Sequence, residues 1–106
     1  MTTFDKREEA FEKKFTIDED LKFKSIARRN KLLGLWVAEK LGKSGPEADA
    51  YAKEMVIAEI DGDDAGVIRK AMGDLAAKAS AITEADLSAK MAELLAVAVA
   101  QVKAGV

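Results

Sequence analysis

The sequence predicts an all-α protein, a small antiparallel four-helix bundle with a long first helix and a flexible N-terminal arm. Three observations favour this fold. Apolar residues recur at steps of three and four, the single proline lies where a helix could begin, and start and stop signals divide the chain into segments of helical length. With 106 residues, 49% of them hydrophobic, the chain can bury a core. We expect an arm over residues 1–15 and a helical domain over residues 16–106.

The main first helix is predicted to run from Leu21 to Leu41. Before it, Thr16 and Glu19 stand three residues apart as a capping box, which indicates a break between the arm and this helix. Gly42 is the predicted stop, because glycine tolerates the left-handed conformation that commonly ends a helix. The predicted inner residues share one helical stripe: Leu21, Phe23, Ile26, Ala27, Leu33, Trp36, Val37 and Leu41.

Two further helices are predicted in the middle of the chain. Pro46 fits the first turn of a helix whose inner side includes Ile60. The turn-rich residues Asp61–Gly66 predict a loop, and a shorter third helix follows from Ile68 to Ala79. Gly73 weakens that third helix by roughly 1 kcal/mol relative to alanine.

The last predicted helix opens with Thr83–Asp86, a capping box in which Asp replaces the usual Glu. Its inner stripe is formed by Leu87, Met91, Leu94, Ala98 and Val102. Its second half is apolar almost all round, so we expect it to be the most buried helix of the bundle.

Composition excludes several classes of function. The chain has no histidine and no cysteine, which removes the common acid–base group and the usual zinc ligands. We therefore expect no enzyme, no catalytic residue and no metal site. A net charge of −2 disfavours nucleic-acid binding.

The longest apolar run, Leu94–Ala100, is too short to span a bilayer, and the first residues lack a secretory signal. We therefore expect a soluble, cytoplasmic protein with no direct membrane insertion.

The stretch FDKREEAFEKKF is the most distinctive part of the sequence. Eight of its twelve residues are charged, and Phe4, Phe11 and Phe15 fall on one narrow stripe of a helix. The stripe fits two interpretations, a continuation of the core helix or an arm that orders on a partner. The sparse apolar content between Phe4 and Phe15 slightly favours a docking arm, since burial of three rings at about 2–3 kcal/mol each could offset the cost of ordering.

Arg28, Arg29 and Lys31 form the densest basic cluster. They could be the solvated face of the first long helix. They could equally contact an acidic protein surface or the phosphates of a nucleotide.

Several stretches of the sequence carry a family resemblance. FDKREEAFEKKF, together with Leu21–Lys24 and the run Ala27–Trp36, resembles the zeta subunit family of alphaproteobacterial F-type ATP synthases, also catalogued as a domain of unknown function. The segments Glu47–Glu54 and Lys90–Leu95 fit the same family.

The resemblance implies an inhibitor protein whose N-terminal arm blocks ATP hydrolysis by the F1 sector. The arm would enter an interface between catalytic alpha and beta subunits, near the central stalk, and the protein would lie in the cytoplasm, held at the inner membrane by the ATP synthase. No cofactor is required, although weak ADP or ATP binding is implied. The alternative is a non-inhibitory interaction module or an adenine-nucleotide-binding module. The arm residues implied are Phe4, Asp5, Arg7, Glu8, Ala10, Phe11, Glu12, Lys14 and Phe15.

Overall fold

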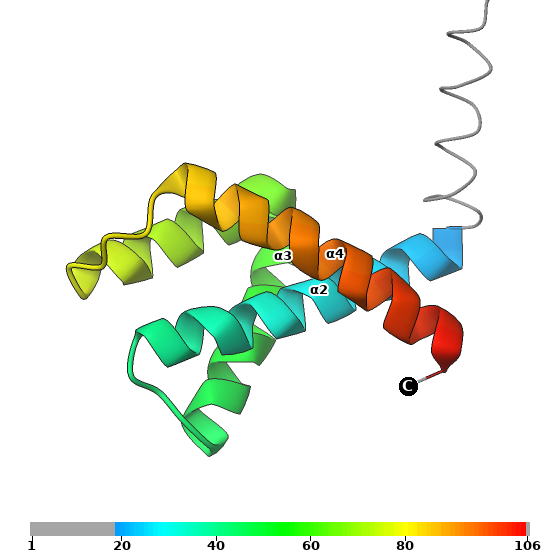
Figure 1. The fold of residues 1–106 in the computed structure, drawn as a ribbon, viewed down its shortest axis with the longest axis horizontal. Helices are drawn as coiled ribbons and strands as arrows, with labels where there is room; N and C mark the ends of the chain where they lie inside the picture. The colour runs from blue at the N-terminus through cyan, green and yellow to red at the C-terminus, as the bar shows by residue number, and fades with distance from the viewer. Residues whose placement is uncertain (1–18, 106) are drawn as a thin grey trace, which may run out of the picture.

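The computed structural model describes residues 19–105, which form three α-helices and no strand. The helices are α2 (Glu19–Lys40), α3 (Pro46–Ala77) and α4 (Glu84–Ala104) (Figure 1). The all-α prediction is therefore confirmed for this part of the chain. The predicted number of four helices is wrong for it, and the N-terminal arm lies outside the described residues.

The helix α3 accounts for the difference in number, because it spans both predicted middle helices. Only Gly62 (φ −145°, ψ 17°) and Asp63 (φ 56°, ψ −160°) leave the helical conformation. The predicted loop over Asp61–Gly66 is thus reduced to a two-residue break. Glycine, aspartate and alanine around the break predict an interruption, but they do not specify how many residues the chain needs to turn.

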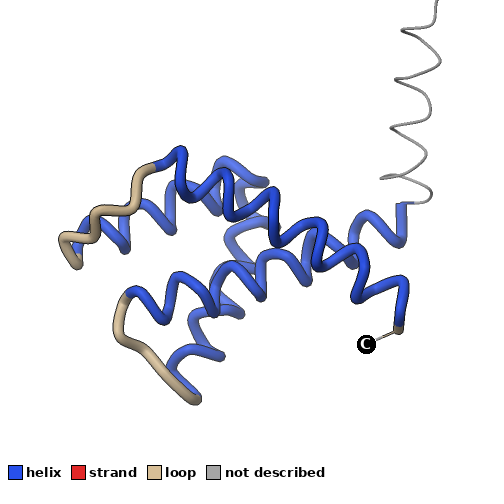
Figure 2. The backbone as a smooth tube through the Cα atoms, in the orientation of Figure 1, coloured by secondary structure: helices blue, strands red, loops and turns tan. Residues whose placement is uncertain are grey.

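The two halves of α3 lie at a steep angle to each other (Figures 1 and 2), and polar side chains join them. The Tyr51 hydroxyl donates a hydrogen bond of 2.7 Å to Asp74. The ammonium of Lys70 forms ion pairs with Glu54 at 3.0 Å and with Asp74 at 3.1 Å. The Tyr51–Asp74 and Lys70–Glu54 contacts cross the break, so they hold the second half of α3 against the first.

Helix ends follow the predicted signals. Gly42 adopts a left-handed φ of 80°, and the Lys43 N–H donates to the Ala38 carbonyl oxygen across 2.9 Å, a Schellman-type ending for α2. At the start of α4, the Asp86 N–H donates to the Thr83 hydroxyl, and the Thr83 N–H donates to the Asp86 carboxylate. Both halves of the predicted capping box are therefore present.

The core lies around α2, which packs against both α3 and α4, while α3 and α4 have little contact with each other. α4 runs back across α2 in the opposite direction (Figure 1). The expectation that the last helix is the most buried is wrong, because α4 rests mainly on one neighbour and much of its alanine and valine surface faces solvent. The buried apolar residues are Leu33, Val37, Ala38, Leu41, Tyr51, Ala52, Met55, Val67, Ala71, Leu75, Leu87, Met91 and Ala98.

Candidate functional site

The expected functional residues fall into two groups. The nine arm residues between Phe4 and Phe15 lie outside the described residues. Arg28, Arg29 and Lys31 lie on α2, where Arg29 is buried against α3 and the other two lie nearer the surface. These surroundings decide which of the three could contact a ligand or a partner.

Arg29 is buried, with 4% of its surface exposed. Its Nη2 donates to Asp64 Oδ1 across 2.7 Å and to Glu59 Oε1 across 3.0 Å. Its Nε also donates to Asn30 Oδ1 across 3.1 Å. The interpretation of this position as a solvated helix face is therefore wrong, since Arg29 joins α2 to both halves of α3.

The two carboxylates of this cluster differ in proton affinity. Burial raises the pKa of Glu59 above its usual value, and hydrogen bonding with Asp64 adds to that effect. Hydrogen bonding from the Arg29 guanidinium lowers the pKa of Asp64. The Asp64 charge is thus the one that balances Arg29 most directly, and Glu59 is the carboxyl that takes up a proton more readily.

Arg28 and Lys31 lie apart from this cluster. Arg28 Nη1 donates to Gln101 Oε1 on α4 across 3.3 Å, and Lys31 is exposed. The structure therefore does not bring the three predicted cations together. It instead places Arg28 and Lys31 beside Lys24, one turn earlier on α2.

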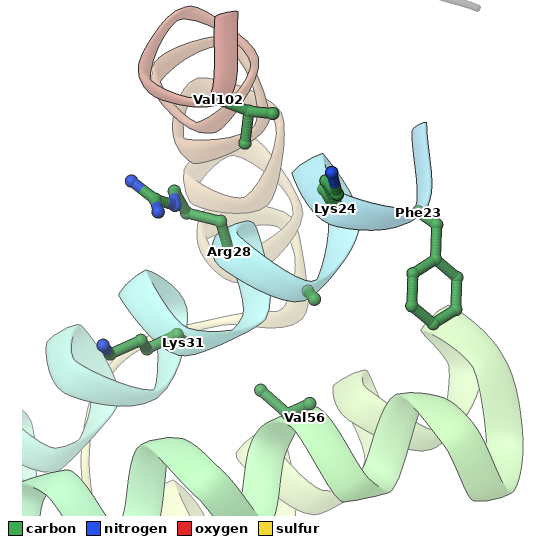
Figure 3. Close-up of a pocket in the computed structure, with 7 residues that line it drawn as sticks. Phe23, Lys24, Arg28, Lys31, Val56 and Val102 are labelled. Atoms are coloured by element: carbon green, nitrogen blue, oxygen red, sulfur yellow. The ribbon is translucent and has the colours of Figure 1, made fainter. Parts of the chain in front are cut away.

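These cations line an open groove where α2 meets α3 and the end of α4 (Figure 3). The groove has a volume of about 520 Å³, and none of the residues that line it is acidic. We call it the basic groove, and its lining residues are Phe23, Lys24, Ala27, Arg28, Lys31, Val56 and Val102.

Two apolar side chains at this end of the molecule are far more exposed than the sequence predicts. Phe23 and Ile60, both assigned to inner stripes, are 71% and 72% exposed. Phe23 also lines a second, more apolar hollow that includes Ile26 and Ile60, so the basic groove continues into an apolar furrow between α2 and α3. Sequence reasoning missed Lys24 and Phe23 as groove residues, although the four- and three-residue steps from Lys24 to Arg28 and Lys31 place all three cations on one helix face.

The chemistry of the groove is that of an anion-attracting apolar surface. Three cations supply hydrogen-bond donors, while Phe23, Ala27 and Val56 supply apolar contact. Among residues 19–105, no group of three or more carboxylates is arranged to hold a metal ion. Within the same residues, no helix is long and apolar enough to cross a membrane.

Comparisons with known proteins relate this chain to a family and to a solved structure. A family model described as ATPase inhibitor subunit zeta matches residues 1–101. A protein solved by solution NMR is 50% identical, with a TM-score of 0.71, and the match covers 81% of this chain and 99% of that one. A search of curated proteins finds no match.

Proposed function

The chain belongs to the ATPase inhibitor subunit zeta family, and from this premise we propose that it inhibits ATP hydrolysis by the F1 sector of an F-type ATP synthase. The observation that carries the proposal is the extent of the family match. It covers residues 1–101, and so includes the arm with Phe4, Phe11 and Phe15 as well as the helical body.

In the proposed mechanism, the arm acts as a wedge. Catalytic interfaces of a rotary ATPase change shape during each turn of the central stalk. A segment that fills one alpha/beta interface and stays there prevents that change, so the inhibitor needs affinity and position and no chemistry of its own. Phe4, Phe11 and Phe15 provide apolar anchors at seven- and four-residue steps, the spacing of a helix that binds in a groove.

The helical body would hold the arm in place. α2 begins at Glu19, shortly after the arm, and its central position between α3 and α4 fixes its direction. The Arg29 contacts to Glu59 and Asp64 support this role, because they tie α2 to α3 on both sides of the break.

The proposal is tested by titrating the intact protein into isolated F1 and measuring ATP hydrolysis. We expect hydrolysis to fall to a low plateau at saturating protein. Ile57→Ser removes an exposed apolar side chain from the body and serves as a control that retains full inhibition. Unchanged hydrolysis at saturating wild-type protein would refute the inhibitory role.

A second candidate function, binding of an adenine nucleotide, is favoured by one observation. The basic groove combines Lys24, Arg28 and Lys31 with the exposed ring of Phe23, which could contact phosphates and a base respectively. Titration with ADP while recording backbone amide shifts tests it. Shifts confined to the groove residues would support nucleotide binding, and their absence at millimolar ADP would exclude this candidate.

A further inference from the structure

The basic groove lies open along α2, between α3 and the end of α4. α2 forms its floor, Val56 of α3 and Val102 of α4 stand on its two sides, and α3 and α4 make little contact with each other (Figure 3). We propose that residues 4–15 of the same chain dock in this groove as a helix that runs antiparallel to α2.

The chain outside the structure ends beside this groove. The first described residue is Glu19, and the groove begins at Phe23, about one turn further along α2. A twelve-residue helix is about 18 Å long, and the stretch of α2 from Phe23 to Lys31 spans about 12 Å. Residues 16–18 leave a connection of three residues, a length typical of two antiparallel helices.

The sequence of the arm complements the groove in charge. At about 100° per residue, Asp5, Glu8 and Glu12 fall on one flank of the phenylalanine stripe, whereas Arg7 and Lys14 fall on the other. The acidic flank matches the cations of the basic groove, which no acidic residue lines.

The arm also complements the groove in its apolar surface. The stripe of Phe4, Phe11 and Phe15 provides rings that fit against Val56 and the exposed ring of Phe23. The small side chain of Ala27 on the floor leaves room for a second helix to approach closely. Occupation of the groove would cover Phe23, which is 71% exposed in the described residues alone.

Docking would regulate the proposed inhibitory function. The rings that bind the groove are the rings that would enter the ATPase, so a docked arm is withheld from its target. This consequence rests on the proposed function, but the docking itself does not. It is therefore tested on the intact protein alone, without any ATPase.

The test uses paramagnetic relaxation, which is convenient because the chain has no cysteine. A nitroxide is attached at Glu9→Cys, on the side of the arm away from the stripe, and amide relaxation is measured at Lys31 and Val102. The reference carries the same label with all three arm phenylalanines changed to serine, so it keeps the tether and lacks the anchors. Stronger relaxation at both positions in the phenylalanine-bearing protein is expected, and equal relaxation in the two proteins would overturn the proposal.

Two further measurements identify the occupant. Combined Lys24→Glu and Lys31→Glu should lower the ratio of docked to free arm about fivefold, because two attractions become repulsions, while Lys22→Glu, outside the groove, should leave it unchanged. No effect of the double change would contradict the charge match. In an equal mixture of spin-labelled protein and isotope-labelled protein, relaxation at Val102 would show docking on a second copy, which would also overturn the proposal.

Discussion

Arg29 on α2 and Asp64 on α3 form an ion pair with a separation of 2.7 Å, although Arg29 is almost fully buried. Asp64 follows the break in α3, and Glu59, the other carboxylate on Arg29, precedes it. A single guanidinium therefore holds both halves of α3 in position on α2.

Removing the guanidinium should destabilise the protein. Arg29→Met keeps an unbranched side chain of lower polarity but leaves Glu59 and Asn30 without their charged partner. Breaking a fully buried pair costs about 3–5 kcal/mol, and because Asp64 is partly exposed we expect a loss of about 2–3 kcal/mol in the free energy of unfolding. Urea denaturation measures this loss in the free energy of unfolding. Lys22→Met, at an exposed position of the same helix, should change stability by less than about 0.5 kcal/mol, and equal losses in the two variants would contradict the account.

Stability should depend on pH in opposite directions through the two carboxyls. The lowered pKa of Asp64 stabilises the fold above the ordinary value of 3.8, and this contribution is lost as pH falls through the folded-state pKa. The raised pKa of Glu59 stabilises the fold below the ordinary value of 4.5, and this contribution is lost as pH rises through the folded-state pKa. We expect the contribution of the cluster to be largest near pH 4.

Two conservative variants separate the contributions of Asp64 and Glu59 to the pH dependence of stability. In a plot of the urea midpoint against pH, Asp64→Asn should flatten the curve on its acid side. Glu59→Gln should flatten the same curve above pH 4.5. Unaltered profiles in both variants would show that the cluster does not control the pH dependence of stability.

Much of the helical pattern could be predicted from local sequence. Gly42, Pro46 and Thr83 mark real helix ends, because each acts through its own backbone or a neighbour within three residues. The burial of Arg29 and the exposure of Phe23 could not be predicted in this way. Both depend on where α3 turns back, and therefore on contacts between residues about thirty positions apart.

Gly34 is required by the close approach of α2 and α3. A Cβ added at this position would lie 2.5 Å from the Cα of Ala52, a backbone atom that cannot move aside without shifting a helix. Gly34→Ala should lower the free energy of unfolding by about 1–3 kcal/mol despite the better helix propensity of alanine. Gly73→Ala is the matched control, since a Cβ added there would meet nothing within 4 Å, and it should raise stability by about 1 kcal/mol. A stabilised Gly34→Ala protein would contradict the close packing.

Asp63 is strained at the break in α3. Its φ of 56° with ψ of −160° is a backbone region that only glycine adopts readily. Asp63→Gly should therefore stabilise the protein by about 1 kcal/mol, after the greater chain entropy of glycine is subtracted. Asp61→Gly, at a helical position just before the break, should lower stability by a few tenths to about 1 kcal/mol. Thermal denaturation of the two variants tests for this strain, and destabilisation in both would argue against strain at Asp63.

The candidate site could be predicted only in part. The sequence singles out Arg28 and Lys31 as cations that could contact a ligand, but it groups them with Arg29, which the fold uses internally. The groove itself is formed by α2, α3 and the end of α4, so Val56 and Val102 could not be assigned to it from local pattern. The arm stays a prediction, because its residues lie outside the part of the chain that the structure describes.

The proposed inhibition by the arm is tested with isolated F1. ATP hydrolysis by isolated F1 is recorded at saturating wild-type protein and at the same concentration of a variant in which Phe4, Phe11 and Phe15 are changed to serine, with circular dichroism to verify that the body remains helical. We expect strong inhibition by the wild type and nearly full hydrolysis with the variant. Equal inhibition by both proteins would contradict it, since the body would then inhibit without the arm.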